Sequence, residues 1–93
     1  MSEYVIVSRH PAAVQFVREE LGLGEDVPVL ATADAANVRD KVVAGNIPLH
    51  LACLCRYVVA VEFDTPPRGA EYTLEDMRRA GAHLKRYRVT RIG

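Results

Sequence analysis

The sequence predicts a compact α/β domain in which a mostly parallel sheet is flanked by helices. Short runs of β-branched residues recur along the 93-residue chain, stretches with helical spacing of apolar residues lie between them, and Gly or Pro stands at most of the boundaries. Strands that alternate with helices favour a parallel sheet, because each helix carries the chain back to the start of the next strand. The length suits a single domain over residues 1–93.

The first two elements are predicted from a β-branched run and a proline. Tyr4–Val7 predicts a short buried strand. Pro11 can open a helix, because the N–H that proline lacks would have no helical partner at that position. Apolar residues then recur at helical spacing as far as Leu21, and Gly22 is expected to end the helix.

Two further strands are expected before the middle of the chain. Residues 27–30 predict a second strand, which should lie at an edge of the sheet because Pro28 cannot donate a ladder hydrogen bond. Residues 31–39 form a polar connection with room for a helical turn after Asp34. Residues 41–44 predict a third strand.

The second half of the chain begins with an apolar helix. Pro48 is expected to open it, and it should run to about Arg56. Its residues are apolar on nearly all sides, which predicts that it is buried. Residues 57–63 predict the longest strand, and residues 66–69 a loop.

A last helix is expected after this loop. Thr73 can cap its first turn, with Asp76 three residues later in a weaker form of the capping box. An apolar stripe at helical spacing continues to Tyr87, so the helix is expected to run that far. Residues 88–92 could add a final strand.

Charge and size narrow the possible partners. Lys and Arg number 12 and Asp and Glu number 12, so the formal net charge is zero. A protein that coats long nucleic acid needs a basic surplus, so no such partner is expected. The longest apolar runs fall far short of the roughly 20 residues of a membrane span, so no membrane association is expected. A domain this small buries only about 60–65% of its unfolded surface, which makes a homodimer a reasonable expectation.

Two cysteines lie close together in the sequence. Cys53 and Cys55 are separated by one residue within an apolar run, a spacing that suits neither a zinc site nor a thioredoxin-type pair. We expect two buried, reduced thiols, which indicates a cytoplasmic protein. The three histidines share no metal-ligand spacing, so neither a metal site nor another cofactor is expected.

Polar residues follow three of the predicted strands. The carboxyl ends of parallel strands one, three and four meet at one edge of the sheet, where ligands of α/β proteins bind. We therefore expect three groups of residues to converge there: Ser8, Arg9, His10 and Pro11; Gly45 and Asn46, with His50 beyond; and Asp64 with Arg68.

The turn from Ser8 to Pro11 is the richest of these groups. It joins a buried strand to a helix N-terminus, where free N–H groups and the helix dipole favour an anion. Arg9 can form a forked contact with a phosphate, and His10 can exchange protons near neutral pH. Ser8 can donate to an oxygen or cap the helix. The alternative is a capped turn with a solvated Arg9 and His10.

The other two groups each have a structural alternative. Gly45 permits close approach of the backbone to a ligand. Asn46 could contact a base or ribose, or could cap the following helix. His50 lies on an apolar helix, where a hydrogen-bonded packing residue is the commoner case. Asp64 could orient a His or Arg, or could belong to a turn.

Several stretches together resemble a small accessory family of type III CRISPR systems. The resemblance covers nearly the whole chain in order, and its most specific parts are Ser-Arg-His-Pro at residues 8–11 and Leu-Glu-Asp-Met-Arg at residues 74–78. The family is similar to CARF-like Rossmann proteins and is grouped with ring nucleases, which destroy cyclic oligoadenylate messengers. The resemblance implies a compact Rossmann-like (CARF-like) domain and a homodimer that binds cyclic tetra-adenylate across its two-fold axis.

The resemblance also suggests a reaction and its residues. A ribose 2′-hydroxyl would attack the adjacent phosphorus without a metal, expelling the 5′-oxygen and leaving a 2′,3′-cyclic phosphate. The expected catalytic residues are His10, Arg9 and Ser8. The expected ligand-binding residues are Ser8, Arg9, Pro11, Gly45, Asn46, His50, Asp64 and Arg68, the last closing over the ligand from its loop. Two alternatives are a protein that sequesters the ring without cutting it and a structural component of a CRISPR complex.

Overall fold

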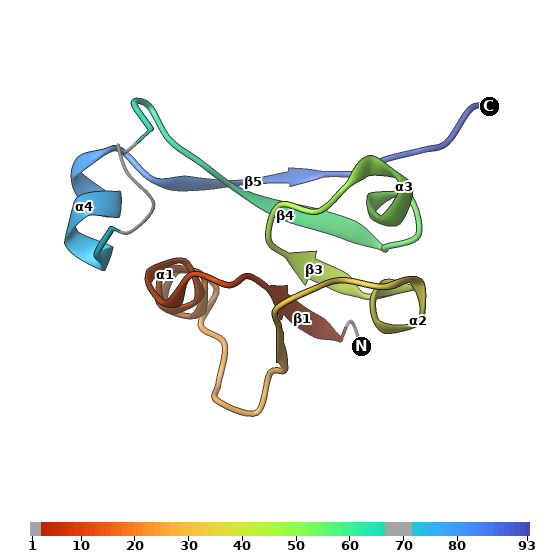
Figure 1. Cartoon of the computed structure of the whole chain (residues 1–93), viewed down its shortest axis with the longest axis horizontal. Coiled ribbons are helices and arrows are strands. Elements are labelled where there is room, and N and C mark those ends of the chain that lie inside the picture. Colours follow the sequence, from red (N-terminus) through yellow and green to blue (C-terminus); the bar gives the residue numbers. More distant parts are fainter. Residues whose placement is uncertain (1–2, 67–71) are drawn as a thin grey trace.

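A single sheet with the strand order β2-β1-β3-β4-β5 organises the chain (Figure 1). The computed structural model describes residues 3–66 and 72–93. The strands are β1 (Tyr4–Val7), β2 (Val29–Leu30), β3 (Val42–Ala44), β4 (Tyr57–Glu62) and β5 (His83–Tyr87). The helices are α1 (Pro11–Leu21), α2 (Ala35–Val38), α3 (Leu49–Ala52) and α4 (Leu74–Arg79). Strands β1 to β4 are parallel and β5 is antiparallel to β4, which confirms the predicted α/β class.

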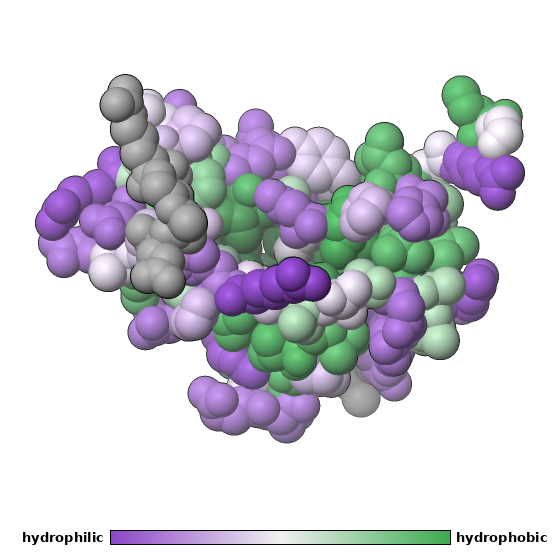
Figure 2. All heavy atoms as spheres, viewed as in Figure 1, coloured by the Kyte–Doolittle hydropathy of each residue, from purple (hydrophilic) through white to green (hydrophobic). Residues whose placement is uncertain are grey.

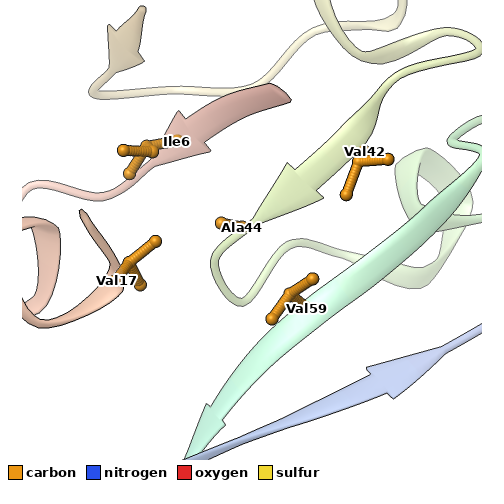
Figure 3. Packing of buried hydrophobic residues seen from close by; sticks show 5 residues of the cluster. All are labelled: Ile6, Val17, Val42, Ala44 and Val59. Atoms are coloured by element: carbon orange, nitrogen blue, oxygen red, sulfur yellow. The ribbon is translucent and has the colours of Figure 1, made fainter. Parts of the chain in front are cut away.

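The face of the sheet toward α1 carries one apolar cluster. Ile6, Val42, Ala44 and Val59 come from three neighbouring strands, and Val17 of α1 packs against them (Figure 3). All five are buried. Burying a side chain of the size of Val or Ile stabilises the fold by about 1.5–3 kcal/mol, so this layer anchors the first strand, the first helix and the centre of the sheet to one another.

The opposite face carries a second cluster. Val5 and Val7 point to this face because successive side chains of a strand alternate. They pack with Val43 of β3 and with Val38 of α2, and Leu51 of α3 lies partly buried against them. Helices therefore cover both faces of the sheet, as a mostly parallel sheet requires.

Helices α1 and α4 are joined by a third cluster. Phe16 and Met77 are almost completely buried in it. Arg78 lies over the Phe16 ring with its guanidinium carbon 5.7 Å from the ring centroid, and pairs with Glu19 at 3.2 Å. These contacts hold α4 beside α1, next to the carboxyl ends of the parallel strands.

The predicted long last helix is wrong. Helix α4 ends at Arg79, and His83–Tyr87 form β5, not two further helical turns. Gly81 adopts a left-handed conformation with φ of 75°, which reverses the chain. Leu84 then packs on the α1 face of the sheet. Its side chain would be buried in a helix as well as in a strand, so burial alone did not distinguish the two. No regular strand follows at residues 88–92.

The predicted helix after Pro48 is shorter and more exposed than expected. Helix α3 covers only Leu49–Ala52; Ala52 is buried, but Leu49 is 74% exposed. After Ala52 the chain forms tight turns, and the Arg56 N–H then donates to the Lys41 carbonyl at 2.8 Å. The chain therefore leaves the helix early to enter β4, and α3 has only four residues.

The edge strand β2 and the short helix α2 lie where the sequence predicted them. The second strand is shorter than predicted, but it lies at the sheet edge, as the proline indicated. Asp34 caps the short helix α2, with its carboxylate accepting the Asn37 N–H at 2.8 Å. Among the described residues, no helix is long and apolar enough to cross a membrane.

Candidate functional site

A cleft of about 370 Å³ opens where β1, β3 and β4 end. In Figure 1 these strands run toward the side of the molecule where α1 and α4 lie, and in Figure 2 the surface in view is hollowed near its centre. Apolar residues line much of the cleft, including Ile6, Ala44, Val61 and Phe63. Its described polar residues are Ser8, Arg9, His10, Asn46 and Tyr72.

The first predicted group forms the start of α1. The Ser8 hydroxyl oxygen accepts the His10 N–H at 3.1 Å, which closes the turn between β1 and α1. His10 is the N-cap residue, although its side chain does not cap the helix, and Pro11 is the first helical residue. The N–H groups of Ala12 and Ala13 belong to the first turn and have no acceptor within the helix. Such a pair favours an anionic ligand.

Arg9 is exposed and held by the chain segment after β2. Its Nε donates to the Ala31 carbonyl at 3.1 Å, and one terminal nitrogen donates to the Thr32 hydroxyl at 2.9 Å. These bonds use two of the five guanidinium N–H donors, so the others can bind a ligand oxygen. Arg9 is the only residue with a permanent charge among the described residues that line the cleft.

His10 stacks on Tyr72, which comes from the segment that leads into α4. The ring centroids are 3.9 Å apart and the planes differ by 18°. The Tyr72 backbone N–H donates to Nε2 of His10 at 3.3 Å. Nδ1 of His10 is buried and has no hydrogen-bond partner among residues 3–66 and 72–93. An unsatisfied buried donor costs about 1–3 kcal/mol, which singles this atom out.

Tyr72 was missed in the sequence analysis, although a local signal existed. It immediately precedes Thr73, the N-cap of α4, at the position of a hydrophobic staple. It belongs to the cluster that contains the buried Met77. That position predicts packing on the helix, but the contact with His10 depends on how α4 sits beside α1.

Gly45 and Asn46 both line the cleft, and their contacts with Val7 and Val61 stabilise the packing of neighbouring strands. Gly45 has φ of 142°, and a side-chain carbon at this position would collide with the Val7 carbonyl oxygen. The glycine therefore allows close approach of β1. The Asn46 side chain accepts the Val61 N–H at 3.2 Å and donates to the Val61 carbonyl at 3.4 Å. The alternative in which Asn46 caps the following helix is wrong, because Pro48 is the N-cap of α3.

The remaining predicted ligand-binding residues are not among the described residues that line the cleft. Pro11 borders an adjoining hollow, which it shares with Arg9, His10 and Tyr72. His50 is exposed on α3 and lines a different hollow, against the C-terminal segment. Asp64 is also exposed, with its carboxylate 3.9 Å from the His83 ring. Arg68 lies outside the described residues.

The capping box of α4 supports the segment beside His10. The Thr73 N–H donates to the Asp76 carboxylate at 3.0 Å, and the Asp76 N–H donates to the Thr73 hydroxyl at 3.1 Å. The hydrogen bond that the Thr73 N–H donates to the carboxylate holds the pKa of Asp76 below its usual range. Elsewhere, the hydrogen bond to Glu62 raises the pKa of Tyr87, and burial raises the pKa of the Cys55 thiol.

The cleft is therefore suited to an anionic ligand with apolar parts. Arg9 and the first turn of α1 supply donors, and no carboxylate opposes them among the described lining residues. Within the described part of the chain, no three His, Cys, Asp or Glu side chains are close enough to hold a metal ion.

Comparison with known proteins identifies a family. The model of a family described as "Putative CRISPR-associated protein (Cas_VVA1548)" matches residues 5–90, which is nearly the whole chain. Neither a curated protein nor a solved structure matches the chain.

Proposed function

The chain belongs to this family of CRISPR-associated proteins, and on that premise we propose that it is a ring nuclease that binds and cleaves cyclic tetra-adenylate. The observation that carries the proposal is the cleft at the strand ends, where Arg9 and the first turn of α1 meet the ring of His10. Arg9 and the N–H groups of the first helical turn can bind a phosphate, and the apolar wall can take a base. Cleavage of the messenger would switch off the antiviral response.

The size of the cleft supports a homodimer. A ring of four nucleotides is larger than the cleft of about 370 Å³ in one chain. Two chains related by a two-fold axis would each bind one half of a ring that has the same internal symmetry. Each copy would then supply one Arg9 and one His10 to one scissile phosphate.

The proposed reaction uses a nucleophile that belongs to the substrate. The ribose 2′-oxygen forms a bond to the adjacent phosphorus and loses its proton, while the bond from phosphorus to the 5′-oxygen breaks and that oxygen takes up a proton. The products are linear di-adenylate species that end in a 2′,3′-cyclic phosphate. The protein has to align the 2′-oxygen and stabilise the charge on phosphorus oxygens, which is work for Arg9 and for the N–H groups of Ala12 and Ala13.

His10 is the proposed proton-exchanging residue. Its Nε2 can accept the proton of the 2′-hydroxyl once it releases the Tyr72 N–H that it binds in the ligand-free protein. Ser8 would position the phosphate or ribose from the same turn, and Asn46 would do so from the end of β3. The reaction is proposed as metal-independent, with alignment and charge stabilisation supplied by the protein.

One observation favours a second function, capture of the ring without cleavage. Nε2 of His10 accepts a hydrogen bond from Tyr72, and Nδ1 is buried. If neither nitrogen becomes available when the ring binds, His10 cannot exchange a proton. The same cleft would then sequester cyclic tetra-adenylate and limit signalling by stoichiometry.

Turnover separates the two functions. Purified protein is mixed with a large molar excess of cyclic tetra-adenylate in the presence of EDTA, and products are followed by chromatography and mass spectrometry. Conversion of all the ring, with the 2′,3′-cyclic phosphate as an early product, is the expected result. An unchanged ring that is captured to saturation would instead support sequestration, and a ring that is neither cut nor bound would contradict both functions.

A further inference from the structure

Tyr72 contacts His10 through both its backbone and its side chain, from a position 62 residues away along the chain. We propose that Tyr72 is a positioning residue that holds the His10 ring in one orientation with its proton on Nδ1. The proposal deepens the function above and assigns a role to a residue outside the predicted site.

The hydrogen bond determines which way the ring faces. Nε2 of His10 accepts the Tyr72 N–H at 3.3 Å, which is slightly longer than the usual range for such bonds. A half-turn of the imidazole would place a ring carbon opposite this N–H and leave the Tyr72 donor without its partner. Loss of this hydrogen bond disfavours the turned ring.

The same bond determines where the ring proton lies. A ring nitrogen that accepts a hydrogen bond carries no proton, so in neutral His10 the proton is on Nδ1. A free imidazole side chain prefers the other tautomer, and the tautomer in a protein follows from the hydrogen bond that one nitrogen makes. The imidazolium form would place an N–H against the Tyr72 N–H, so protonation of Nε2 must break this contact.

The Tyr72 side chain restrains the plane of the His10 ring. The two rings are nearly parallel at 3.9 Å, and Phe63 packs edge-on against Tyr72 with centroids 6.1 Å apart. Tyr72 itself is held by the start of α4. Thr73 and Asp76 form a complete capping box there, and Met77 is fully buried one turn later.

The consequence for the reaction rests on the proposed function. His10 enters the reaction with its orientation already set, and acceptance of a proton requires that Nε2 exchange the Tyr72 N–H for the 2′-hydroxyl. Loss of the Tyr72 ring should therefore slow cleavage rather than weaken ring binding, which depends on Arg9. Misplacement of a reacting group by about 1 Å can cost on the order of a hundredfold in rate.

The first test is NMR of ligand-free protein and needs no activity. Long-range correlations between ring protons and nitrogens report which nitrogen of His10 is protonated, and the exposed His50 is the internal reference. We expect an Nδ1–H tautomer for His10 in the wild type and in Tyr72→Phe, which keeps the ring and the N–H. Tyr72→Leu also keeps the N–H and should keep the Nδ1–H tautomer. Tyr72→Pro lacks this N–H and should give the Nε2–H form. An Nε2–H tautomer in the wild type overturns the proposal.

The second test is single-turnover cleavage of cyclic tetra-adenylate with the dissociation constant measured in parallel. Tyr72→Phe should match the wild type, and Tyr72→Leu should be slower by tenfold to a hundredfold with binding unchanged within about twofold. Equal rates for both variants and the wild type would contradict the positioning role. A wild type that does not cleave the ring would reject the proposed function, while the NMR result would still decide the role of Tyr72. If Tyr72→Pro does not fold, wild type, Tyr72→Phe and Tyr72→Leu still decide it.

Discussion

The Asn46 side-chain amide pairs with both backbone polar groups of Val61, accepting its N–H at 3.2 Å and donating to its carbonyl at 3.4 Å. The pair continues the bonding between β3 and β4 beyond Ala44↔Val59, the last residue pair of their register. A side chain thus connects the two strands at the mouth of the cleft. Two structural predictions concern this region.

Replacement of Asn46 should loosen the carboxyl end of β4. Asn46→Ala removes both bonds to Val61 and should lower the free energy of unfolding by about 0.5–1.5 kcal/mol. Asn46→Asp keeps the acceptor for the Val61 N–H and should lose less. Urea unfolding of the three proteins measures the difference, and an Asn46→Ala variant as stable as the wild type would show that the pair contributes nothing.

Gly45→Ala should destabilise the fold more than a comparable glycine change elsewhere. At Gly45 an added carbon meets the Val7 carbonyl oxygen, and φ of 142° is unfavourable for any other residue. Strain of this kind costs about 1–3 kcal/mol before the steric clash is added. Gly22→Ala is the matched control, because Gly22 also has a positive φ of 65° but has open space around it. Thermal unfolding should rank Gly45→Ala below Gly22→Ala; the reverse order would contradict the close approach of β1 and β3.

Arg9→Ala should weaken ring binding and cleavage together. Loss of a charged hydrogen bond of about 1.5–3 kcal/mol corresponds to a drop in affinity of roughly tenfold to a hundredfold. Thr32→Val removes only the hydroxyl that accepts from Arg9 and should have a smaller effect. Calorimetric titration with cyclic tetra-adenylate measures both, and unchanged affinity in Arg9→Ala would remove Arg9 from the binding site.

His10→Ala should slow cleavage and leave ring binding nearly intact. Proton transfer by a positioned side chain contributes about 10²–10⁴-fold to a rate, and the loss should lie in this range. Single-turnover cleavage and the dissociation constant separate the two effects. Full activity in His10→Ala would show that another group exchanges the proton.

The capping box predicts a pH dependence for the start of α4. The folded-state pKa of Asp76 lies below its unfolded value because Thr73 donates to the carboxylate. The stabilisation is therefore complete above the unfolded pKa of about 3.9 and is lost as the pH falls through the folded pKa. Urea unfolding of the wild type and Asp76→Asn, measured from pH 6 to pH 2, should give curves that converge at low pH. A constant difference between the curves across this range would show that Asp76 is not responsible.

Local patterns in the sequence were sufficient for the first half of the fold. The β-branched run at Tyr4–Val7, Pro11 at the start of α1 and Gly22 at its end all act through neighbours within a few residues. The edge position of β2 follows from the missing N–H of one proline. The capping box of Thr73 and Asp76 is likewise local. It could be predicted because the two residues are three positions apart in the sequence.

The same reasoning failed where local patterns allow two structures. Leu84 fits the buried side of a helix and equally the buried side of a strand, and the exposed backbone edge of β4 decides for the strand. The apolar residues after Pro48 predicted a buried helix to about Arg56, but the return of the chain to β4 at Arg56 ends the helix early, and Leu49 is exposed. Both outcomes depend on where a distant strand lies.

The sequence by itself therefore determined the α/β class and the presence of polar turns after the parallel strands. It also determined that Ser8 and Asn46 meet at one edge of the sheet. Only the tertiary structure decided that Asn46 binds the backbone of Val61 and that Tyr72 holds His10. Turns, caps and strand ends arise from interactions within a few residues, whereas these contacts join residues 15 and 62 positions apart and form only when the helices have packed on the sheet.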